Sequence, residues 1–451
     1  MSELPQGWET VNLGKVAEFE MGQAPPGAFC NKEGNGTVFV KAGEFGIDHP
    51  QVREWTTQPL KFAHRGDVLI CVVGATSGKL NLGIDCAIGR SVAAIRPSVA
   101  ASQKIIYRQL QLQVAQLRAD SSGTAQGVIS KQMLADIQLV LPPVSEQTRI
   151  AKQLDTLLTR VQTCNDRFDA IPALLKRFRQ TVLDAATTGR LTEDWRGLDD
   201  LDQGEWKTVA LQDVITEMRN GLAQKPAESP PGSKILRIGA VRSGQLNLDD
   251  HRYLVVSDKE AEQYALKQDD LLFTRYNGSL EFVGVCAALT HDAPGYVYPD
   301  KLIRVRVRAD RAIAKFIEIV FGCRRMRTQV ESFVKSSAGQ RGVSGADLKA
   351  AKFSLPPITE QAEIVRRAEA LFALADRIEA RCTAARTQAQ RLTPLVLAKA
   401  FRGELVPQDP NDEPASALLA RIASSNTAVA GKNKQKAPVV RNERAQAAIN
   451  L

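Results

Sequence analysis

The heptapeptide LPPVSEQ spans Leu141 to Gln147, and a near copy, LPPITEQ, spans Leu355 to Gln361, 214 positions later. Gly189 in TTGRL and Gly403 in FRGEL keep the same spacing. The same offset holds from Ser130 to Leu191 and from Ser344 to Leu405, so the agreement is not confined to one short motif. The chain is therefore built from two copies of one unit, and the repeated phrase sits inside the part that the copies share most closely.

Upstream of the heptapeptide the spacing drifts. Trp8 in GWETVNL matches Trp206 in EWKTVAL at 198 positions, and Asp67 in GDVLI matches Asp270 in DDLLF at 203. Loops absorb insertions at low cost in free energy, whereas packed helices do not. The drift therefore marks the adaptable part of each unit, which precedes the shared phrase.

Length and composition are those of an ordinary two-domain protein. The chain has 451 residues, 44% of them hydrophobic, and a formal net charge of +9 that lies mainly in the second copy and the C-terminal segment. Such a charge favours a polyanionic partner. We expect no membrane segment, and seven scattered cysteines favour a reducing cytoplasm over a disulfide framework.

A heptad seam of apolar residues follows each copy of the phrase, which predicts two long helices that pack on a partner. The spacing favours packing of the two helices on each other within the chain, and the alternative is a homodimeric coiled coil. A straight helix over the first seam would cover roughly 50 Å. The seam residues are Ile150, Leu154, Leu157, Val161, Cys164, Phe168, Ile171, Leu175, Phe178 and Val182, and then Ile364, Ala368, Leu371, Ala375, Ile378, Cys382, Ala385, Ala389, Leu392 and Val396.

The helix ends and interruptions can also be predicted. Ser145 and Thr359 follow proline pairs and are expected to be N-caps. Pro172 and Pro394 fall inside the heptad pattern, and each is expected to kink or divide its helix because proline lacks a backbone donor. These two prolines occupy unequal places in the 214-residue frame, so the helices should not be bent alike.

The part of each copy that precedes its helix is expected to be α+β. Short β-rich runs such as VFVKA, DVLICVV and SVAAI occur in the first, and ILRIGAV, DLLFTRY and KLIRVRVR in the second. An amphipathic helix follows in each, and its apolar stripe is more typical of core than of function. The sequence thus predicts two α+β domains on a shared helical frame.

Two pairs of loops are candidates for contact with DNA, with an ordinary structural turn as the alternative reading of each. The first pair, VGATSGK and TRYNGS, follows the strand that begins with Asp67 or Asp270. The string GATSGK differs from a nucleotide-binding P-loop in its spacing and in the Leu80 that follows it. The second pair is SSGTAQG and SSAGQRG. The candidate residues are Thr76, Ser77, Lys79, Gln126, Arg275, Asn277, Ser279, Gln340 and Arg341.

A third candidate is the run Arg304, Arg306 and Arg308, which alternation places on one face of a strand. A solvated sheet face explains this row better, because we find no matching row in the first copy. No catalytic constellation emerges: the four histidines are isolated, and no glycine-rich cofactor loop follows a strand. We therefore expect a binding protein with no metal site and no cofactor of its own.

These motifs together resemble the specificity subunit of a type I restriction-modification system. The resemblance covers about residues 4 to 422 and rests on the P-x-G-W-x-x-V-x-L opening, the GDVLI strand, the loop before LPP-x-x-EQ, the long helix, and the endings TGRLTEDWR and FRGELVPQDPNDEPASALLARI. It implies two target recognition domains, joined and separated by two antiparallel helices, that read the halves of an asymmetric bipartite sequence in double-stranded DNA.

The resemblance also implies partners. Two methyltransferase subunits would supply S-adenosylmethionine and methylate adenine, and ATP-dependent restriction subunits would cleave DNA, so catalysis would lie outside this chain. Residues 189–196 and 403–422 would be docking surfaces. A non-catalytic scaffold that binds proteins is the alternative, and an intrinsic nuclease or methyltransferase is disfavoured.

The expected domain organisation follows from these assignments. The first recognition domain takes residues 1–143, the first spacer helix and linker 144–203, the second recognition domain 204–357, and the second spacer helix 358–403. Residues 404–451 form a C-terminal extension, polar and basic, that is expected to be disordered from about 423.

Overall fold

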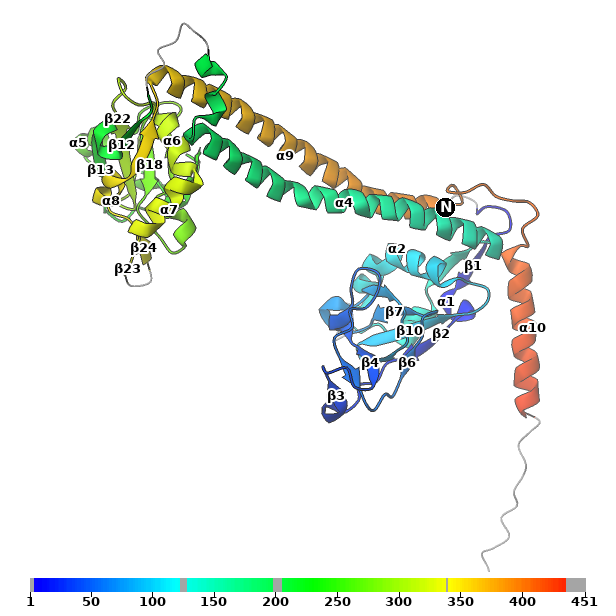
Figure 1. Ribbon diagram of the computed structural model, residues 1–451. Helices are drawn as coiled ribbons and strands as arrows, with labels where there is room; N and C mark the ends of the chain where they lie inside the picture. The colour runs from blue at the N-terminus through cyan, green and yellow to red at the C-terminus, as the bar shows by residue number, and fades with distance from the viewer. Residues whose placement is uncertain (1–3, 122–127, 198–204, 338–339, 435–451) are drawn as a thin grey trace, which may run out of the picture. The chain divides into compact units, whose positions relative to one another are not determined.

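The computed structural model describes residues 4–121, 128–197, 205–337 and 340–434 (Figure 1). Its contacts divide the chain into two compact units, one made of residues 1–166 and 386–451 and the other of residues 167–385. Each unit contains a sheet-bearing domain, the beginning or end of α4, and the opposite end of α9. The chain is therefore not partitioned at the border between the two sequence copies.

The first sheet-bearing domain holds three sheets in the orders β2-β10-β7-β8, β3-β5-β4-β9-β6 and β1-β11. Strand β7 is buried on both faces, because Val68 and Ile70 enter one core and Leu69 and Cys71 enter another. Its elements are β1 (Glu9–Asn12), α1 (Leu13–Val16), β2 (Ala17–Met21), β3 (Cys30–Asn31), β4 (Thr37–Val40), β5 (Trp55–Thr56), β6 (Phe62–Ala63), β7 (Val68–Cys71), β8 (Leu80–Leu82), β9 (Cys86–Ile88), β10 (Val92–Pro97), α2 (Gln103–Ser121), α3 (Lys131–Ala135) and β11 (Gln138–Leu141).

The second sheet-bearing domain repeats this plan with different loops. Its elements are β12 (Lys207–Ala210), β13 (Ile215–Asn220), β14 (Ser233–Leu236), β15 (Val241–Arg242), β16 (Gln245–Leu246), β17 (His251–Leu254), α5 (Asp258–Gln263), β18 (Leu271–Thr274), β19 (Tyr276–Asn277), β20 (Cys286–Ala288), β21 (Tyr296–Val297), β22 (Leu302–Val307), α6 (Ala314–Gly322), α7 (Arg324–Phe333), β23 (Lys335–Ser337), β24 (Gln340–Gly342), α8 (Gly345–Ala350) and β25 (Lys352–Leu355).

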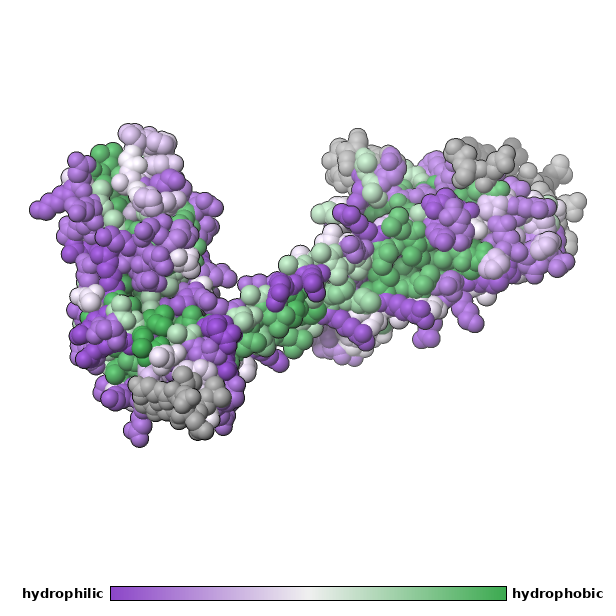
Figure 2. Space-filling model, turned by 90° about the horizontal axis from the view of Figure 1, so that it is seen from above, coloured by the Kyte–Doolittle hydropathy of each residue, from purple (hydrophilic) through white to green (hydrophobic). Residues whose placement is uncertain are grey.

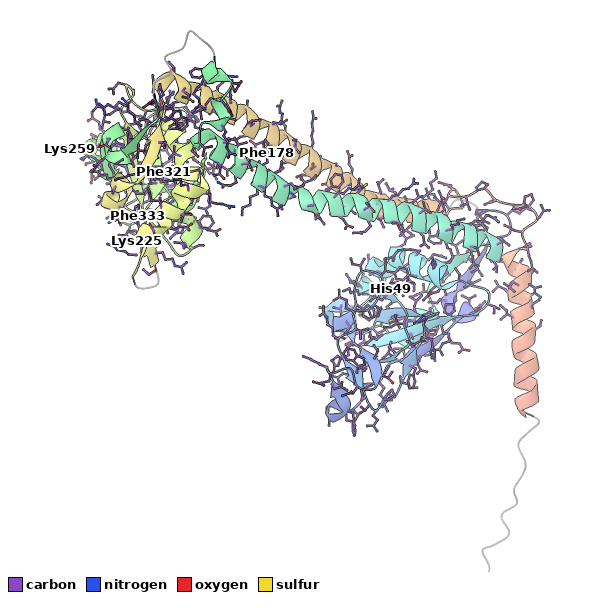
Figure 3. All side chains as sticks on the ribbon, viewed as in Figure 1. His49, Phe178, Lys225, Lys259, Phe321 and Phe333 are labelled. Carbon is purple, nitrogen blue, oxygen red and sulfur yellow. The ribbon has the colours of Figure 1, made fainter. Side chains whose placement is uncertain are left out.

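The central sheet of this domain, β13-β22-β18-β20, corresponds to β2-β10-β7-β8 of the first. Phe273 and Phe321 meet edge to face in its main core, with ring centroids 4.8 Å apart. Phe178 of α4 packs on the same core (Figure 3). The α+β class expected from the sequence is confirmed, and α4 is anchored in the second domain through its own apolar face.

Helices α4 (Val144–Thr187) and α9 (Ile358–Ala400) pack antiparallel on each other within each unit. In the first unit Ile150 and Leu154 cluster with Leu397 and Ala400. In the second unit Val182 and Ala186 share a core with Ile364 and Ala368. Packing within the chain, rather than between two chains, is thus the arrangement present, and the heptad seam is the surface used.

The seam is not buried evenly. Among its predicted members, Leu157, Val161, Phe168 and Leu371 are half-buried, but Ile378 and Leu392 are 39% and 45% exposed. These two residues are therefore more exposed than their predicted seam positions imply. Figure 2 shows hydrophobic residues visible along the paired helices.

The structure narrows one prediction about the helices and corrects another. Each helix remains continuous through its internal proline, Pro172 in α4 and Pro394 in α9, so neither proline divides its helix. Ser145 and Thr359 lie inside the first turn rather than at the N-cap, because the helices begin at Val144 and Ile358. Proline lacks a backbone N–H, so each helix continues with one backbone hydrogen bond fewer.

The glutamate of each heptapeptide joins the helix to the opening strand of its domain. Trp8 donates from its indole to Glu146 Oε2 at 2.8 Å, and Trp206 donates to Glu360 Oε2 at 2.9 Å. Glu360 Oε1 also accepts from Thr192 at 2.7 Å and from Arg196 at 2.8 Å. In contrast, the buried Oε1 of Glu146 has no hydrogen-bond partner in the described part of the chain.

The glutamine that follows fastens the helix to the loop before the amphipathic helix of the domain. Gln147 donates to the carbonyls of Ala100 and Pro142 at 2.8 and 2.9 Å, and accepts from the amide of Ser102 at 2.9 Å. Gln361 makes the same three bonds with Arg311, Pro356 and Ile313, each at 2.9 Å. The repeated phrase is therefore the joint between domain and helix, and its two polar side chains are structural.

The C-terminal segment of the first unit is helical further than predicted. The first turns of helix α10 (Ala415–Lys434) lie against the first domain, where Leu418, Leu419 and Ile422 pack on its core. The expectation of disorder from about residue 423 is thus wrong as far as 434, and residues 435–451 lie outside the described structure. No described helix is long and apolar enough to cross a membrane.

Candidate nucleic-acid interface

Two of the loops singled out in the sequence meet in the second domain. Strand β19 pairs antiparallel with β24, with Tyr276 opposite Gly342 and Asn277 opposite Arg341, and β23 pairs with the other edge of β24. The resulting three-stranded sheet β19-β24-β23 lies at the end of the domain away from α9 (Figure 1). We call these strands the hairpin sheet. The structure thus brings Arg275, Asn277, Ser279, Gln340 and Arg341 into one surface.

Tyr276 is the centre of this surface, and the sequence reading did not identify it. A Cβ at position 342 would lie 2.3 Å from the Tyr276 ring, so glycine is required there for the ring to lie on the strand. The guanidinium carbon of Arg275 lies 4.7 Å from the centroid of the same ring. The role of Tyr276 depends on the pairing of β19 with β24. The sequence does not reveal that pairing, because it joins segments more than sixty residues apart.

Positive charge predominates on this surface. Arg341 is exposed and Arg275 half-buried, and neither forms an ion pair within the described part of the chain. Lys335, also missed from the sequence, is exposed on the adjacent strand and lines a hollow of about 400 Å³ with Tyr276, Gln340 and the carboxylate of Asp347. Three cations and one carboxylate around a shallow hollow favour an anionic partner such as a phosphate backbone.

The turn between Asn277 and Ser279 is held by its own side chains. Asn277 Oδ1 accepts from the amide of Ser279 at 3.0 Å, and the Ser279 hydroxyl donates to Glu281 at 3.3 Å. The acceptor of Asn277 is therefore occupied, while its amide nitrogen donates no hydrogen bond within the described hairpin sheet. Both residues are half-buried, so they shape the turn as well as border the surface.

The corresponding turn of the first domain is hydrogen-bonded to other parts of its own domain. Thr76 ends the 3-10 turn Gly74–Thr76 and is exposed. Lys79 is exposed, and its Nζ donates to the Phe45 carbonyl at 2.6 Å. Ser77 is only 5% exposed, and its carbonyl accepts from Arg118 at 2.6 Å. The side chain of Ser77 therefore does not reach the surface, which removes it from the predicted contact residues.

The two domains build this region on the same backbone plan. The amide of Ile129 donates to Val72 at 2.8 Å, and the amide of Val343 donates to Arg275 at 3.0 Å, which places Arg275 where the first domain has Val72. Gln126, the remaining predicted contact, lies outside the described residues. The difference in charge at this position is one physical basis for unlike surfaces on the two domains.

The arginine row is a structural network, so the expectation of a solvated sheet face is wrong for its first member. Arg304 is 1% exposed because both faces of β22 are covered, and its guanidinium donates to Glu217 at 3.0 Å. Arg306 donates to Asp270 at 2.6 Å, and Arg96 makes the same ion pair with Asp67 in the first domain. The first copy therefore has a counterpart to one arginine of this row, because Arg96 makes the ion pair that Arg306 makes in the second copy.

Three of the cysteine thiols are buried and titrate high. Burial raises the pKa of the Cys71 thiol to about 11 and that of Cys86 to about 12, and burial also raises the pKa of the Cys286 thiol well above its ordinary value. These thiols are therefore neutral at physiological pH. Among the described residues, no group of three or more His, Cys, Asp or Glu is placed to hold a metal ion.

Comparisons with known proteins give a consistent answer. The type I restriction modification DNA specificity domain matches residues 5–172. The type I restriction enzyme EcoKI specificity subunit of Escherichia coli (strain K12) is 41% identical over 376 residues, covering 81% of this chain and 80% of that protein. The StySPI specificity subunit of Salmonella potsdam is 32% identical, with the same coverage of both chains.

Solved structures show the same fold. A chain from a type I R-M system matches with a TM-score of 0.67 at 17% identity, covering 90% of this chain and 100% of that one. The HsdS subunit of Thermoanaerobacter tengcongensis matches with a TM-score of 0.59 at 17% identity, covering 89% and 98%. The similarity thus includes both sheet-bearing domains and both long helices.

Proposed function

Because this chain belongs to the specificity subunits of type I restriction enzymes, we propose that it reads an asymmetric bipartite DNA sequence, one half with each sheet-bearing domain. A single observation carries this proposal. The two domains share their sheets and joints, yet the second has Arg275 where the first has Val72, and it presents Tyr276 and Arg341 beside that arginine on the hairpin sheet. A common frame with unlike surfaces suits two unlike half-sites.

The contacts in the second domain follow from its chemistry. Arg341 and Arg275 offer paired N–H donors that match the acceptor edge of guanine, whereas Lys335 is suited to phosphate. Gln340 offers both a donor and an acceptor, as adenine requires. In the first domain Thr76 and Lys79 are the exposed candidates. Phosphate contacts would position the duplex, and these side chains would distinguish its sequence.

The chain contributes recognition and no catalytic step. Specificity subunits assemble with modification and restriction subunits, and we infer two modification subunits here because the joints and helices occur twice. The segments after the two helices, residues 189–196 and 403–422, are proposed docking surfaces. DNA methylation and cleavage would then occur on the partners, with S-adenosylmethionine and ATP bound there.

An exchange of domains tests the proposal. Residues 1–140 are replaced by the corresponding segment of a related subunit that keeps tryptophan at position 8 and the loop that accepts Gln147, so that the joint is preserved. Methylated adenines are then mapped across DNA from cells that carry the hybrid complex. One half of the methylated sequence should change and the other should stay.

The matched control exchanges residues 205–354 and keeps the bonds of Trp206 and Gln361. It should change the opposite half. If either exchange altered both halves, or if neither altered the sequence, separate reading by the two domains would be refuted.

A further inference from the structure

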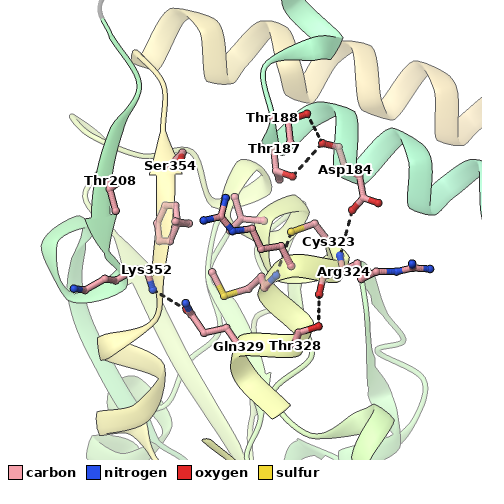
Figure 4. A pocket seen from close by; sticks show the side chains of 14 residues that line it. Asp184, Thr187, Thr188, Thr208, Cys323, Arg324, Thr328, Gln329, Lys352 and Ser354 are labelled. Carbon is pink, nitrogen blue, oxygen red and sulfur yellow. Dashed lines mark hydrogen bonds between the residues drawn. The ribbon is translucent and has the colours of Figure 1, made fainter. Parts of the chain in front are cut away.

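The second unit contains a groove of about 770 Å³ that the hairpin sheet does not share (Figure 4). It lies between the last turn of α4, with Asp184 and Thr187, the start of α7, with Arg324, and strand β25, with Lys352 and Ser354. Its floor is apolar, formed by Val320, Met326 and Phe353, which are all buried. The groove follows one edge of β25.

In the first unit two glutamines of α2 cover the matching strand, β11. Gln109 donates to the carbonyl of Val140 at 2.7 Å and accepts from its amide at 2.8 Å. Gln113 donates to the carbonyl of Gln138 at 2.8 Å. The outer edge of β11 is therefore satisfied by side-chain amides, as a buried strand edge must be.

The second unit lacks these glutamines. The amides of Ser102 and Ile313 bond to equivalent glutamines of the two joints, so α2 aligns with α6 and Gln109 corresponds to Val320. Helix α6 ends at Gly322, so this alignment gives no counterpart of Gln113, and Gln329 of α7 instead accepts from the amide of Lys352. Valine cannot hydrogen-bond with a strand. The change from Gln109 to Val320 therefore leaves the edge of β25 at Ser354 without a glutamine.

The exposed strand edge offers both donors and acceptors. Thr208 lies opposite Ser354, as Thr10 lies opposite Val140, so the two strand pairs share one register. The backbone amide and carbonyl of Ser354 therefore point into the groove, as those of Val140 point to Gln109. In the described part of the chain, β25 pairs only with β12, and Gln329 occupies the amide of Lys352 at 2.8 Å.

The rim of the groove is cationic. Arg324, Arg325 and Lys352 are exposed, and no ion pair involving them occurs within the described residues. The facing carboxylate, Asp184, is engaged, because it accepts from the amide of Arg324 at 3.3 Å and from Gln180 at 3.1 Å. A ligand here would meet an excess of positive charge around a hydrogen-bonding strand edge.

We propose that this groove binds an extended, acidic segment of a partner polypeptide, which adds a strand to the free edge of β25. A peptide backbone alternates N–H and C=O groups as the edge requires, and acidic side chains match the rim. A nucleic-acid backbone supplies phosphate acceptors but few donors for the carbonyls of Ser354 and Lys352. The groove and the hairpin sheet also have no lining residue in common.

The test measures fluorescence anisotropy of a labelled, capped hexapeptide of alternating glutamate and valine, titrated with the full chain. A hexapeptide of alternating lysine and valine is the charge control. The acidic peptide should bind at least about tenfold more tightly than the basic one. Amide hydrogen exchange in residues 352–355 should slow when the acidic peptide is bound.

Val320→Gln installs the side chain that closes the matching place in the first unit, where Gln109 is itself buried. It should weaken acidic peptide binding about tenfold or more, since it occupies the edge of Ser354. The double variant Arg324→Glu and Arg325→Glu changes only exposed residues, so it remains informative if Val320→Gln fails to fold. It should weaken the acidic peptide and strengthen the basic one.

Three results would overturn the proposal. The first is equal binding of the two peptides by the unaltered chain. The second is acidic peptide binding that the arginine double variant leaves unchanged. The third is complete displacement of the peptide by a duplex lacking the target sequence, which would assign the groove to phosphate binding instead.

Discussion

Arg341 lies directly opposite Asn277 in the antiparallel pairing of β24 with β19, so two loops distant in sequence present one surface. Arg341 is exposed at that point, and Arg275 stacks on the neighbouring Tyr276. This arrangement turns a general expectation of DNA contact into predictions about single side chains.

Arg341→Ala or Arg275→Ala should weaken binding through the second half-site by about 1–3 kcal/mol if the arginine contacts a guanine edge with two hydrogen bonds. The measurement is competition binding of the assembled complex to duplexes altered in one half-site, at fixed salt. Discrimination at one base pair should relax at the same time.

Arg308→Ala is the control for these variants, because Arg308 is exposed in the same domain and pairs with Asp310. This substitution also removes one positive charge, but at a site away from the hairpin sheet. Discrimination between half-site sequences should therefore be unchanged. If the Arg341 and Arg275 variants bound DNA as this control variant does, neither arginine would contact a base.

Lys79→Met tests the first domain. Loss of one phosphate contact should weaken binding to specific and nonspecific duplexes alike and lower the slope of log K against log salt by about 1. Lys15→Met, an exposed lysine of α1 in the same domain, should leave that slope unchanged. A Lys79 variant with the unaltered slope would limit this lysine to its bond with the Phe45 carbonyl.

Gly342→Ala tests the organisation of the hairpin sheet. The added methyl would lie 2.3 Å from the Tyr276 ring, so the ring or strand must move, at a cost of about 1–3 kcal/mol in the free energy of unfolding. Gly278→Ala is the matched control, since nothing lies within 4 Å of its added Cβ. Thermal unfolding and half-site binding should both separate the two variants, and equal behaviour would contradict the packing described.

Replacing the glutamate of each joint with glutamine should have opposite effects on the free energy of unfolding. Glu360→Gln should cost about 1.5–3 kcal/mol in the free energy of unfolding at neutral pH, because it removes a buried carboxylate that Arg196 and Thr192 satisfy. Glu146→Gln should be neutral or stabilising, because burial raises the pKa of that carboxyl and one oxygen has no partner.

The pH dependence of Glu146→Gln gives the sign. A raised pKa in the folded state means that the folded chain binds more protons than the unfolded one, so the unaltered chain loses stability as pH rises above the ordinary value of 4.5. The advantage of the glutamine variant should therefore grow above pH 4.5 and vanish below it. Chemical denaturation at several pH values measures this, and an advantage that grew toward acid would be the opposite of the expected result.

The helices and joints were largely predictable from the sequence. Leu154, Val182 and Ile364 are buried as the heptad spacing indicates, because one helical face alone meets the partner helix. The residues that follow the two long helices are equally regular. Gly189 and Gly403 both have a φ of +76°. Such features depend on local periodicity, which a single sequence contains.

Features that depend on pairing between distant segments were not predictable. Arg304 alternates like a surface residue, yet both faces of its strand are covered. Tyr276 becomes central only when β19 pairs with β24, and the burial of Ser77 depends on the position of α2. Sequence spacing identifies the strands, but it does not state which strands and helices will cover them.

The composition of the two compact units has a consequence for proteolysis. The first unit takes residues 1–166 and 386–451, so the chain passes from one unit to the other within α4 and returns within α9. Residues 198–204 fall within the sequence range of the second unit, so a protease that cut there would divide the residues of that unit between two fragments. Each fragment would retain part of both cores, and the nicked halves could separate only if both cores came apart.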